Sequence, residues 1–153
     1  MNPEEQKTSV VIERIYSLLI RVKEKKNTIH YSDCFTQGFD MQYVNKYCHF
    51  VQERPGVINN IPYILGAIGR VCNDLKLPPL CCLVVNKETR KCGEGVIVSK
   101  PNLQGESPSD FAERVDRPAT YNCNNYPQPG TQQAKDFLNL IMNRLREKGL
   151  TRE

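Results

Sequence analysis

Apolar residues recur at three- and four-residue steps in three stretches of the chain, and this spacing predicts three amphipathic helices. The first occupies residues 1–27, where an Asn-Pro pair is typical of a helix start and a cluster of lysines of a helix end. The second begins near Asn60, and the third occupies residues 131–149 with a glycine at its C-terminal stop. The positions expected to be buried are Val11, Ile15, Leu18, Leu19 and Val22; Ile64, Leu65, Ile68, Val71, Cys72 and Leu75; and Ala134, Phe137, Leu138, Ile141 and Leu145.

Shorter elements are predicted between the first two helices. Residues 28–31 are β-prone, Ser32 can cap a brief helical turn, and Asp40 can cap a further helix that an Arg-Pro-Gly turn closes. That helix would place five side chains on one face: Tyr43, Val44, Tyr47, Cys48 and Val51.

A double proline ends the second long helix, and the unbroken apolar run at residues 80–85 predicts a buried strand. Residues 86–95 form a basic, glycine-containing turn, and residues 96–99 are expected to pair back on the strand as a hairpin. Helix, strand, basic loop and strand is the order of a winged helix. Residues 28–99 therefore predict a winged-helix-like core whose hairpin is the wing.

The composition changes over residues 100–130, which are rich in Pro, Asn, Gln and Gly and predict a loop-rich segment. Within it, Ser107 and Asp110 form a capping box that predicts a short helix. The sequence as a whole predicts an α+β fold of one domain, residues 1–153, with long N- and C-terminal helices around the winged-helix-like core.

Composition and charge narrow the classes of function only slightly. With 153 residues, 39% hydrophobic and 25% charged, the chain is typical of a folded globular domain. Its net charge of +4 is compatible with a nucleic-acid partner or an acidic protein partner. The acidic N-terminus is unlike a secretory signal, and no run approaches the roughly 18 apolar residues of a membrane span. We therefore expect a cytoplasmic protein that does not enter a membrane and whose seven cysteines are reduced thiols.

The basic turn is the strongest candidate for contact with a partner. Lys87, Arg90 and Lys91 could reach phosphate groups from a hairpin tip, and Arg70 on the preceding helix could join them. Because Glu88 and Glu94 dilute this charge, the alternative is a solvated loop without a partner.

Cysteine and histidine offer few candidates for catalysis. Cys92 is the candidate reactive thiol, because Arg90 and Lys91 beside it would stabilise a thiolate on an exposed turn. Cys81 and Cys82 would point to opposite faces of a strand and so could not chelate one ion together. No spaced Cys/His cluster, phosphate-binding loop or dinucleotide fingerprint occurs, and we expect neither a metal nor a cofactor.

Two glycines in the second long helix allow two interpretations. The run Gly66-Ala67-Ile68-Gly69 has the spacing of the G-x-x-G clamp of KH modules, which bind single-stranded nucleic acid. It lies inside a helical pattern, however, where small residues three apart more often mark close helix packing. Packing is the interpretation that the pattern favours.

Residues 31–95 resemble the winged-helix domain of alkyltransferases and alkyltransferase-like proteins, especially in the runs ILGAIGR, residues 64–70, and LPPLCCLVV, residues 77–85. The resemblance implies a winged-helix topology and binding to damaged DNA. In that family the reactive cysteine stands in a Pro-Cys-His-Arg motif. Neither His nor Arg follows Cys81 or Cys82 here, so alkyl transfer is not implied, and we use the resemblance for topology alone.

Three hypotheses for the function follow from the sequence. The first is a non-catalytic protein that binds a macromolecule, nucleic acid above all, through a winged-helix-like surface. The second is a small inhibitor or immunity protein of bacterial or phage origin that binds another protein, with Tyr121 and Tyr126 in its recognition loop. The third is an enzyme that uses the thiol of Cys92.

Overall fold

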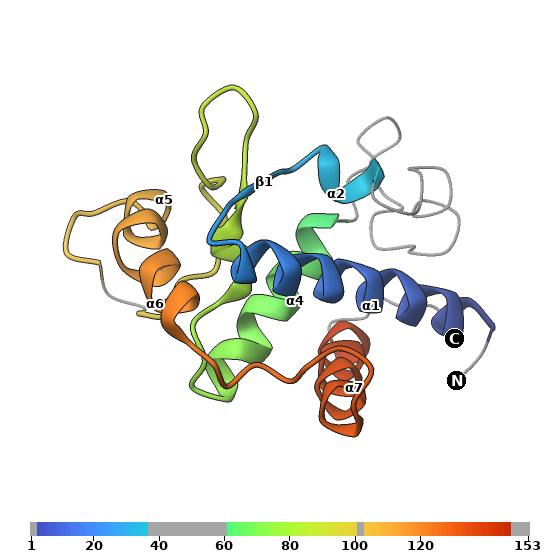
Figure 1. Cartoon of the computed structure of the whole chain (residues 1–153). Coiled ribbons are helices and arrows are strands. Elements are labelled where there is room, and N and C mark those ends of the chain that lie inside the picture. The colour runs from blue at the N-terminus through green and yellow to red at the C-terminus, as the bar shows by residue number, and fades with distance from the viewer. Residues whose placement is uncertain (1–2, 37–60, 101–102, 148–153) are drawn as a thin grey trace.

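The computed structural model describes residues 3–36, 61–100 and 103–147 (Figure 1). In these ranges the fold is α+β, because most residues are helical and two short strands form one parallel sheet. The helix predicted after Asp40 lies outside the described residues.

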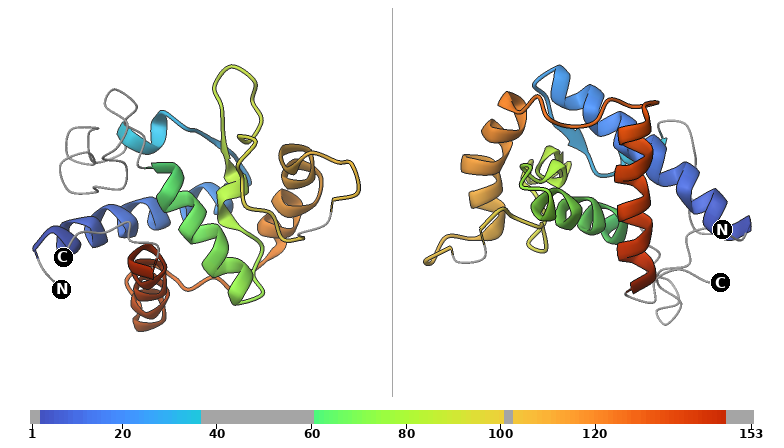
Figure 2. Two further views of the ribbon diagram at one scale, coloured as in Figure 1. Left: turned by 180° about the vertical axis from the view of Figure 1, so that it is seen from behind. Right: turned by 90° about the horizontal axis from the view of Figure 1, so that it is seen from below.

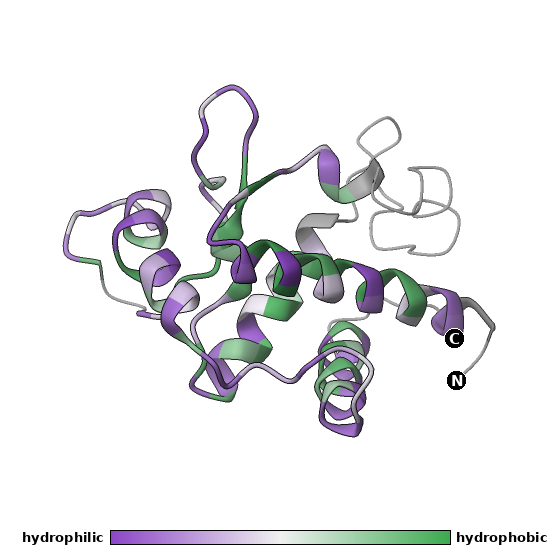
Figure 3. Cartoon of the chain, viewed as in Figure 1, coloured by the Kyte–Doolittle hydropathy of each residue, from purple (hydrophilic) through white to green (hydrophobic). Residues whose placement is uncertain are grey.

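The three predicted long helices are present and pack together. They are α1 (Pro3–Glu24), α4 (Ile61–Asp74) and α7 (Gln132–Glu147). Helix α4 lies at the centre, packed against α7 and against a short 3-10 helix, η1 (Leu80–Leu83), and α1 contacts both of these (Figure 2). Apolar and polar positions alternate around α1 and α7, so each helix turns one face to the core (Figure 3). No helix in the described ranges is long and apolar enough to cross a membrane.

The predicted core positions are buried with two exceptions. Val22 is only partly buried, and Leu75 is 45% exposed. Leu75 follows the end of α4, where Lys76 takes a left-handed backbone with φ of 59°. The amide of Leu77 then donates to the carbonyl of Cys72 at 2.8 Å, which closes the helix as a Schellman motif. This turn directs Leu75 to solvent and brings Leu77 back to the core.

The first and last helices are also joined at their outer ends. Arg146 of α7 donates through its Nε atom to the carboxylate of Glu5 on α1, and Glu5 is only 6% exposed. Nearer the middle, the rings of Tyr16 and Phe137 lie 5.0 Å apart between centroids. Burial and an ion pair therefore hold α1 and α7 together.

The sheet differs from the predicted hairpin. Only Val84–Val85 form a strand, β2, and it pairs in parallel with β1 (Ile29–His30), with Ile29 opposite Val84 and His30 opposite Val85. The rest of the predicted strand is the 3-10 helix η1. The β-prone residues 28–31 therefore contain a strand as predicted, but its partner is β2.

Residues 96–99 form no strand, so the predicted hairpin wing is wrong. Side chains of other elements donate hydrogen bonds to backbone carbonyls of this segment. The thiol of Cys81 donates to the carbonyl of Ile97 at 3.4 Å, and the side-chain amide of Asn73 donates to that of Val98 at 2.9 Å. Residues 96–98 thus run along α4 instead of pairing with β2.

Residues 108–122 are more helical than the sequence predicts. Ser107 caps α5 (Pro108–Phe111) as expected, since its hydroxyl oxygen accepts from the amide of Asp110 at 3.1 Å. The helix then continues through a π-helical turn, η2 (Ala112–Asp116), into α6 (Arg117–Asn122). Pro118 has no amide proton to donate within this continuous helix, and it directly follows the π-helical turn, where the regular α-helical bonding is interrupted.

Candidate functional site

The predicted basic turn, residues 86–95, is a loop that projects from the body of the molecule (Figure 1). We call it the 86–95 loop. Its outer part is closed by backbone bonds: Asn86 donates to the carbonyl of Lys91, and Arg90 donates to that of Asn86, each at 2.8 Å. Arg90 takes a left-handed backbone conformation with φ of 59°, which residues other than glycine rarely adopt. The loop is therefore a defined turn.

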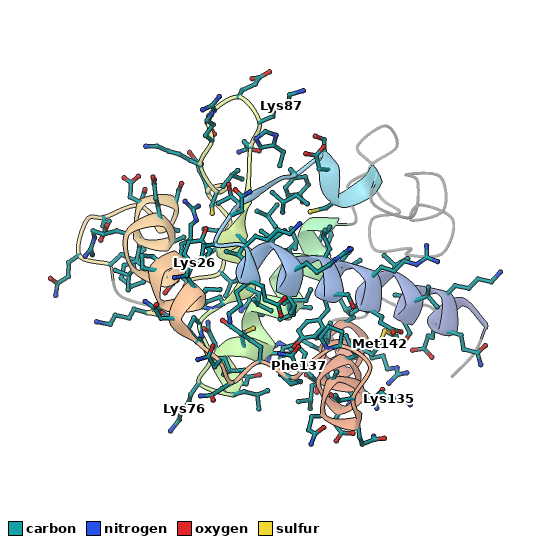
Figure 4. All side chains as sticks on the ribbon, viewed as in Figure 1. Lys26, Lys76, Lys87, Lys135, Phe137 and Met142 are labelled. Atoms are coloured by element: carbon teal, nitrogen blue, oxygen red, sulfur yellow. The ribbon has the colours of Figure 1, made fainter. Side chains whose placement is uncertain are left out.

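All three basic side chains predicted on this loop are exposed. Lys91 lies 3.4 Å from Asp110, so its charge helps to tie the loop to α5. Within the described ranges neither Lys87 nor Arg90 takes part in a salt bridge. Lys87 lies near the outer end of the loop (Figure 4). Two cations are thus presented to solvent on the projecting loop.

A pocket of about 300 Å³ lies between the base of this loop and α4. Apolar side chains line much of it, and Tyr31 and Asn86 add an aromatic ring and an amide. None of the described residues that line it is charged. At Gly66, Gly93 and Gly95, the place of a Cβ atom is open space, so bare backbone forms part of the wall. Sequence reasoning missed this pocket and the contributions of Tyr31 and Asn86.

The two glycines of the G-x-x-G run have different surroundings. A Cβ atom on Gly69 would lie 2.8 Å from the sulfur of Cys81 and 2.9 Å from Cβ of Ile97. Gly69 therefore lets η1 and residues 96–98 approach α4 closely, as the packing interpretation predicts. Gly66, one turn earlier, opens on the pocket.

Arg70 is exposed on α4, four residues after Gly66. Residues four apart lie on the same face of a helix, so Arg70 belongs to the face that borders the pocket. Tyr63, three residues before Gly66, continues this face and is 41% exposed. The predicted contact residues Arg70, Lys87 and Arg90 therefore come from two elements that border one pocket.

Cys92 does not have the environment that the sequence predicts. It is 4% exposed, and its thiol donates to the carbonyl of Cys82 at 3.3 Å. Burial raises the pKa of the Cys92 thiol, and the guanidinium of Arg117, 3.6 Å from the sulfur, offsets only part of this effect. Arg117 of α6 contacts the sulfur, and burial leaves the thiol of Cys92 neither accessible nor readily ionised.

This burial predicts the order in which the native thiols react. Of the described cysteines, Cys123 is half-buried and the others are buried. Iodoacetamide should therefore modify Cys123 well before Cys92, which mass spectrometry of timed digests would measure. Denatured protein, in which the two should react alike, is the control. Faster modification of Cys92 in the native protein would contradict the burial described here.

The two tyrosines predicted for a recognition loop make contacts within the protein. Tyr126 is 5% exposed, and its hydroxyl donates to the carbonyl of Pro78. Tyr121 is half-buried and donates to the carbonyl of Asn27 at 2.7 Å. Both hydroxyls join distant parts of the chain, so these side chains stabilise the fold.

A buried carboxylate anchors the chain beyond the loop. Asp116 is 1% exposed and accepts from both the amide, at 3.0 Å, and the hydroxyl of Ser99. Burial raises the pKa of this carboxyl group, and the two bonds from Ser99 oppose the shift. The segment that leaves the pocket is therefore attached to the π-helical turn η2.

Among the described residues no cluster of His, Cys, Asp and Glu could hold a metal ion. Comparisons with protein-family models, curated proteins and solved structures gave no match. The interpretation of the site therefore depends on its own geometry and charge.

Proposed function

We propose that this protein binds nucleic acid through α4 and the 86–95 loop. One observation carries the proposal: the exposed cations predicted from the sequence, Arg70, Lys87 and Arg90, lie on two elements that border the same pocket. Lysine and arginine side chains in such positions contact phosphate oxygens and so fix the position of the bound nucleic acid.

The geometry favours this function over the two alternatives. An enzyme based on Cys92 would need an accessible, ionisable thiol, and this thiol is buried with a raised pKa. The inhibitor hypothesis depended on Tyr121 and Tyr126, whose hydroxyls are bonded within the protein. Of the predicted winged helix, the proposal keeps only a helix, α4, beside a projecting basic loop, because residues 96–99 form no strand and the loop is therefore not a hairpin wing.

The test is the dependence of binding on salt and charge. Affinity for a labelled nucleic acid, measured by fluorescence anisotropy, should fall steeply between about 50 and 200 mM salt, because bound phosphates release counterions. The double variant Lys87→Gln with Arg90→Asn should weaken binding and reduce the slope of log affinity against log salt by about 2. Asparagine is chosen at position 90 because it tolerates a left-handed backbone.

A matched double variant distinguishes the effect of this site on binding from the effect of net charge. Lys135→Gln with Arg14→Gln removes two exposed cations from α7 and α1, away from the loop. It should leave the salt slope unchanged. Equal losses in both double variants would mean that binding depends on overall charge alone, and the absence of binding to any nucleic acid at low salt would refute the proposal.

A further inference from the structure

We infer that the pocket beside the 86–95 loop holds one unpaired base, so that the protein prefers single-stranded nucleic acid to duplex. This inference rests on the proposed function and names its substrate class. It follows from the contrast between the pocket, which has no charged residue in its described lining, and the exposed cations on the elements that border it.

The lining of the pocket suits an uncharged planar group. Leu65, Val84 and Ile97 provide apolar surface, Tyr31 provides an aromatic ring, and Asn86 provides an amide that can both donate and accept hydrogen bonds. A nucleobase combines these properties, since its faces stack on aromatic rings and its edge carries donors and acceptors. An anionic phosphate would be desolvated there without a charged partner and is excluded on energetic grounds.

The size and position of the pocket favour a single-stranded nucleic acid over a duplex. Its volume of about 300 Å³ is at the lower end of the range for ligand pockets, so it admits a single small group. A base in a duplex is stacked and paired and must leave the helix to enter such a site, whereas an unpaired base needs only to turn. Phosphates on either side of that base would then lie towards Arg70 on α4 and towards Lys87 and Arg90 on the loop.

Bare backbone at three wall positions allows the pocket to be filled without disturbing the core. Gly66 is helical and faces open space, so Gly66→Leu should project a side chain into the pocket without a clash at its Cβ atom. Leucine also has a higher helix propensity than glycine, which favours folding of this variant. Gly95→Ala fills less of the space from the opposite wall and serves as a second variant. The control is Gln133→Leu, which adds the same side chain at an exposed position of α7.

The experiment compares three labelled probes of one sequence by fluorescence anisotropy: a single strand, its duplex, and the single strand with abasic sites. Loss of one stacked base typically lowers affinity about five- to 150-fold, so the wild-type protein should bind the intact strand at least fivefold more tightly than the abasic strand. It should also bind the intact strand more tightly than the duplex. Gly66→Leu should abolish both differences, Gly95→Ala should reduce them, and Gln133→Leu should retain them.

Any other outcome would contradict the binding of an unpaired base, its assignment to this pocket, or the proposed function. Equal affinity for single strand and duplex, or for intact and abasic strands, would overturn the unpaired-base inference while leaving nucleic-acid binding in place. Retention of both differences by Gly66→Leu would overturn the assignment to this pocket. No binding of any probe at low salt would overturn the proposed function and the inference together. Thermal melting of every variant verifies that it is folded.

Discussion

Replacing Ile141 with alanine is expected to lower the free energy of unfolding by about 2–5 kcal/mol, because the side chain is fully buried where α7 packs on the core. Such a loss is a large fraction of the stability of a small domain. Urea denaturation followed by circular dichroism would measure it. The truncation leaves a cavity that the tightly packed helices α1 and α4 can fill only in part.

The neighbouring residue provides the control. Leu140 is 43% exposed, so Leu140→Ala should change the free energy of unfolding by no more than about 0.5 kcal/mol. If the apolar stripe of α7 served instead as a surface for a partner, Ile141→Ala would be as harmless as Leu140→Ala. Equal midpoints for the two variants would therefore contradict the packing described here.

The second large effect is expected at Gly69. Gly69→Ala should destabilise the protein by about 1–3 kcal/mol, because the new methyl group would lie within 3 Å of both Cys81 and Ile97. A shift of either neighbour would disturb the hydrogen bond from the thiol of buried Cys81 to the carbonyl of Ile97. The midpoint of thermal unfolding would fall accordingly.

Gly66→Ala is the matched variant on the same helix. Its methyl group meets open space, and alanine has the higher helix propensity, so stability should rise by about 0.5–1 kcal/mol. The two substitutions are chemically identical and lie one turn apart. A result in which both variants are stabilised would show that η1 and residues 96–98 do not pack on α4 as closely as described.

The sequence predicts the long helices well because helical periodicity is a local property. The buried stripe of α7 and the capping of α5 by Ser107 each depend on residues a few positions apart. Pairing of strands is not local. The partner of β2 is Ile29–His30, far back in the chain, and nothing in the apolar run at residues 80–85 distinguishes a parallel partner there from a hairpin partner at residues 96–99.

Only the exposed cationic residues of the candidate site could be predicted from the sequence. Arg70, Lys87 and Arg90 are exposed as expected, because long cationic side chains rarely leave solvent. The pocket could not be predicted, since its walls come from Tyr31, α4, η1, β2, the 86–95 loop and residues 96–97. Cys92 was predicted wrongly for the same reason: its neighbours in sequence are cations, but its surroundings come from Cys82 and Arg117.

The contact between Glu5 and Arg146 brings the outer ends of α1 and α7 together, so the described chain nearly closes on itself. Such an arrangement is suited to circular permutation, in which a flexible linker would join α7 to α1 and the chain would be reopened elsewhere. The exposed turn at Gln104 and Gly105, both with left-handed backbones, offers a place to reopen it. A permuted protein would carry α5, η2 and α6 at its N-terminus and end with the 86–95 loop and the residues that follow it, while every helix of the core stayed whole.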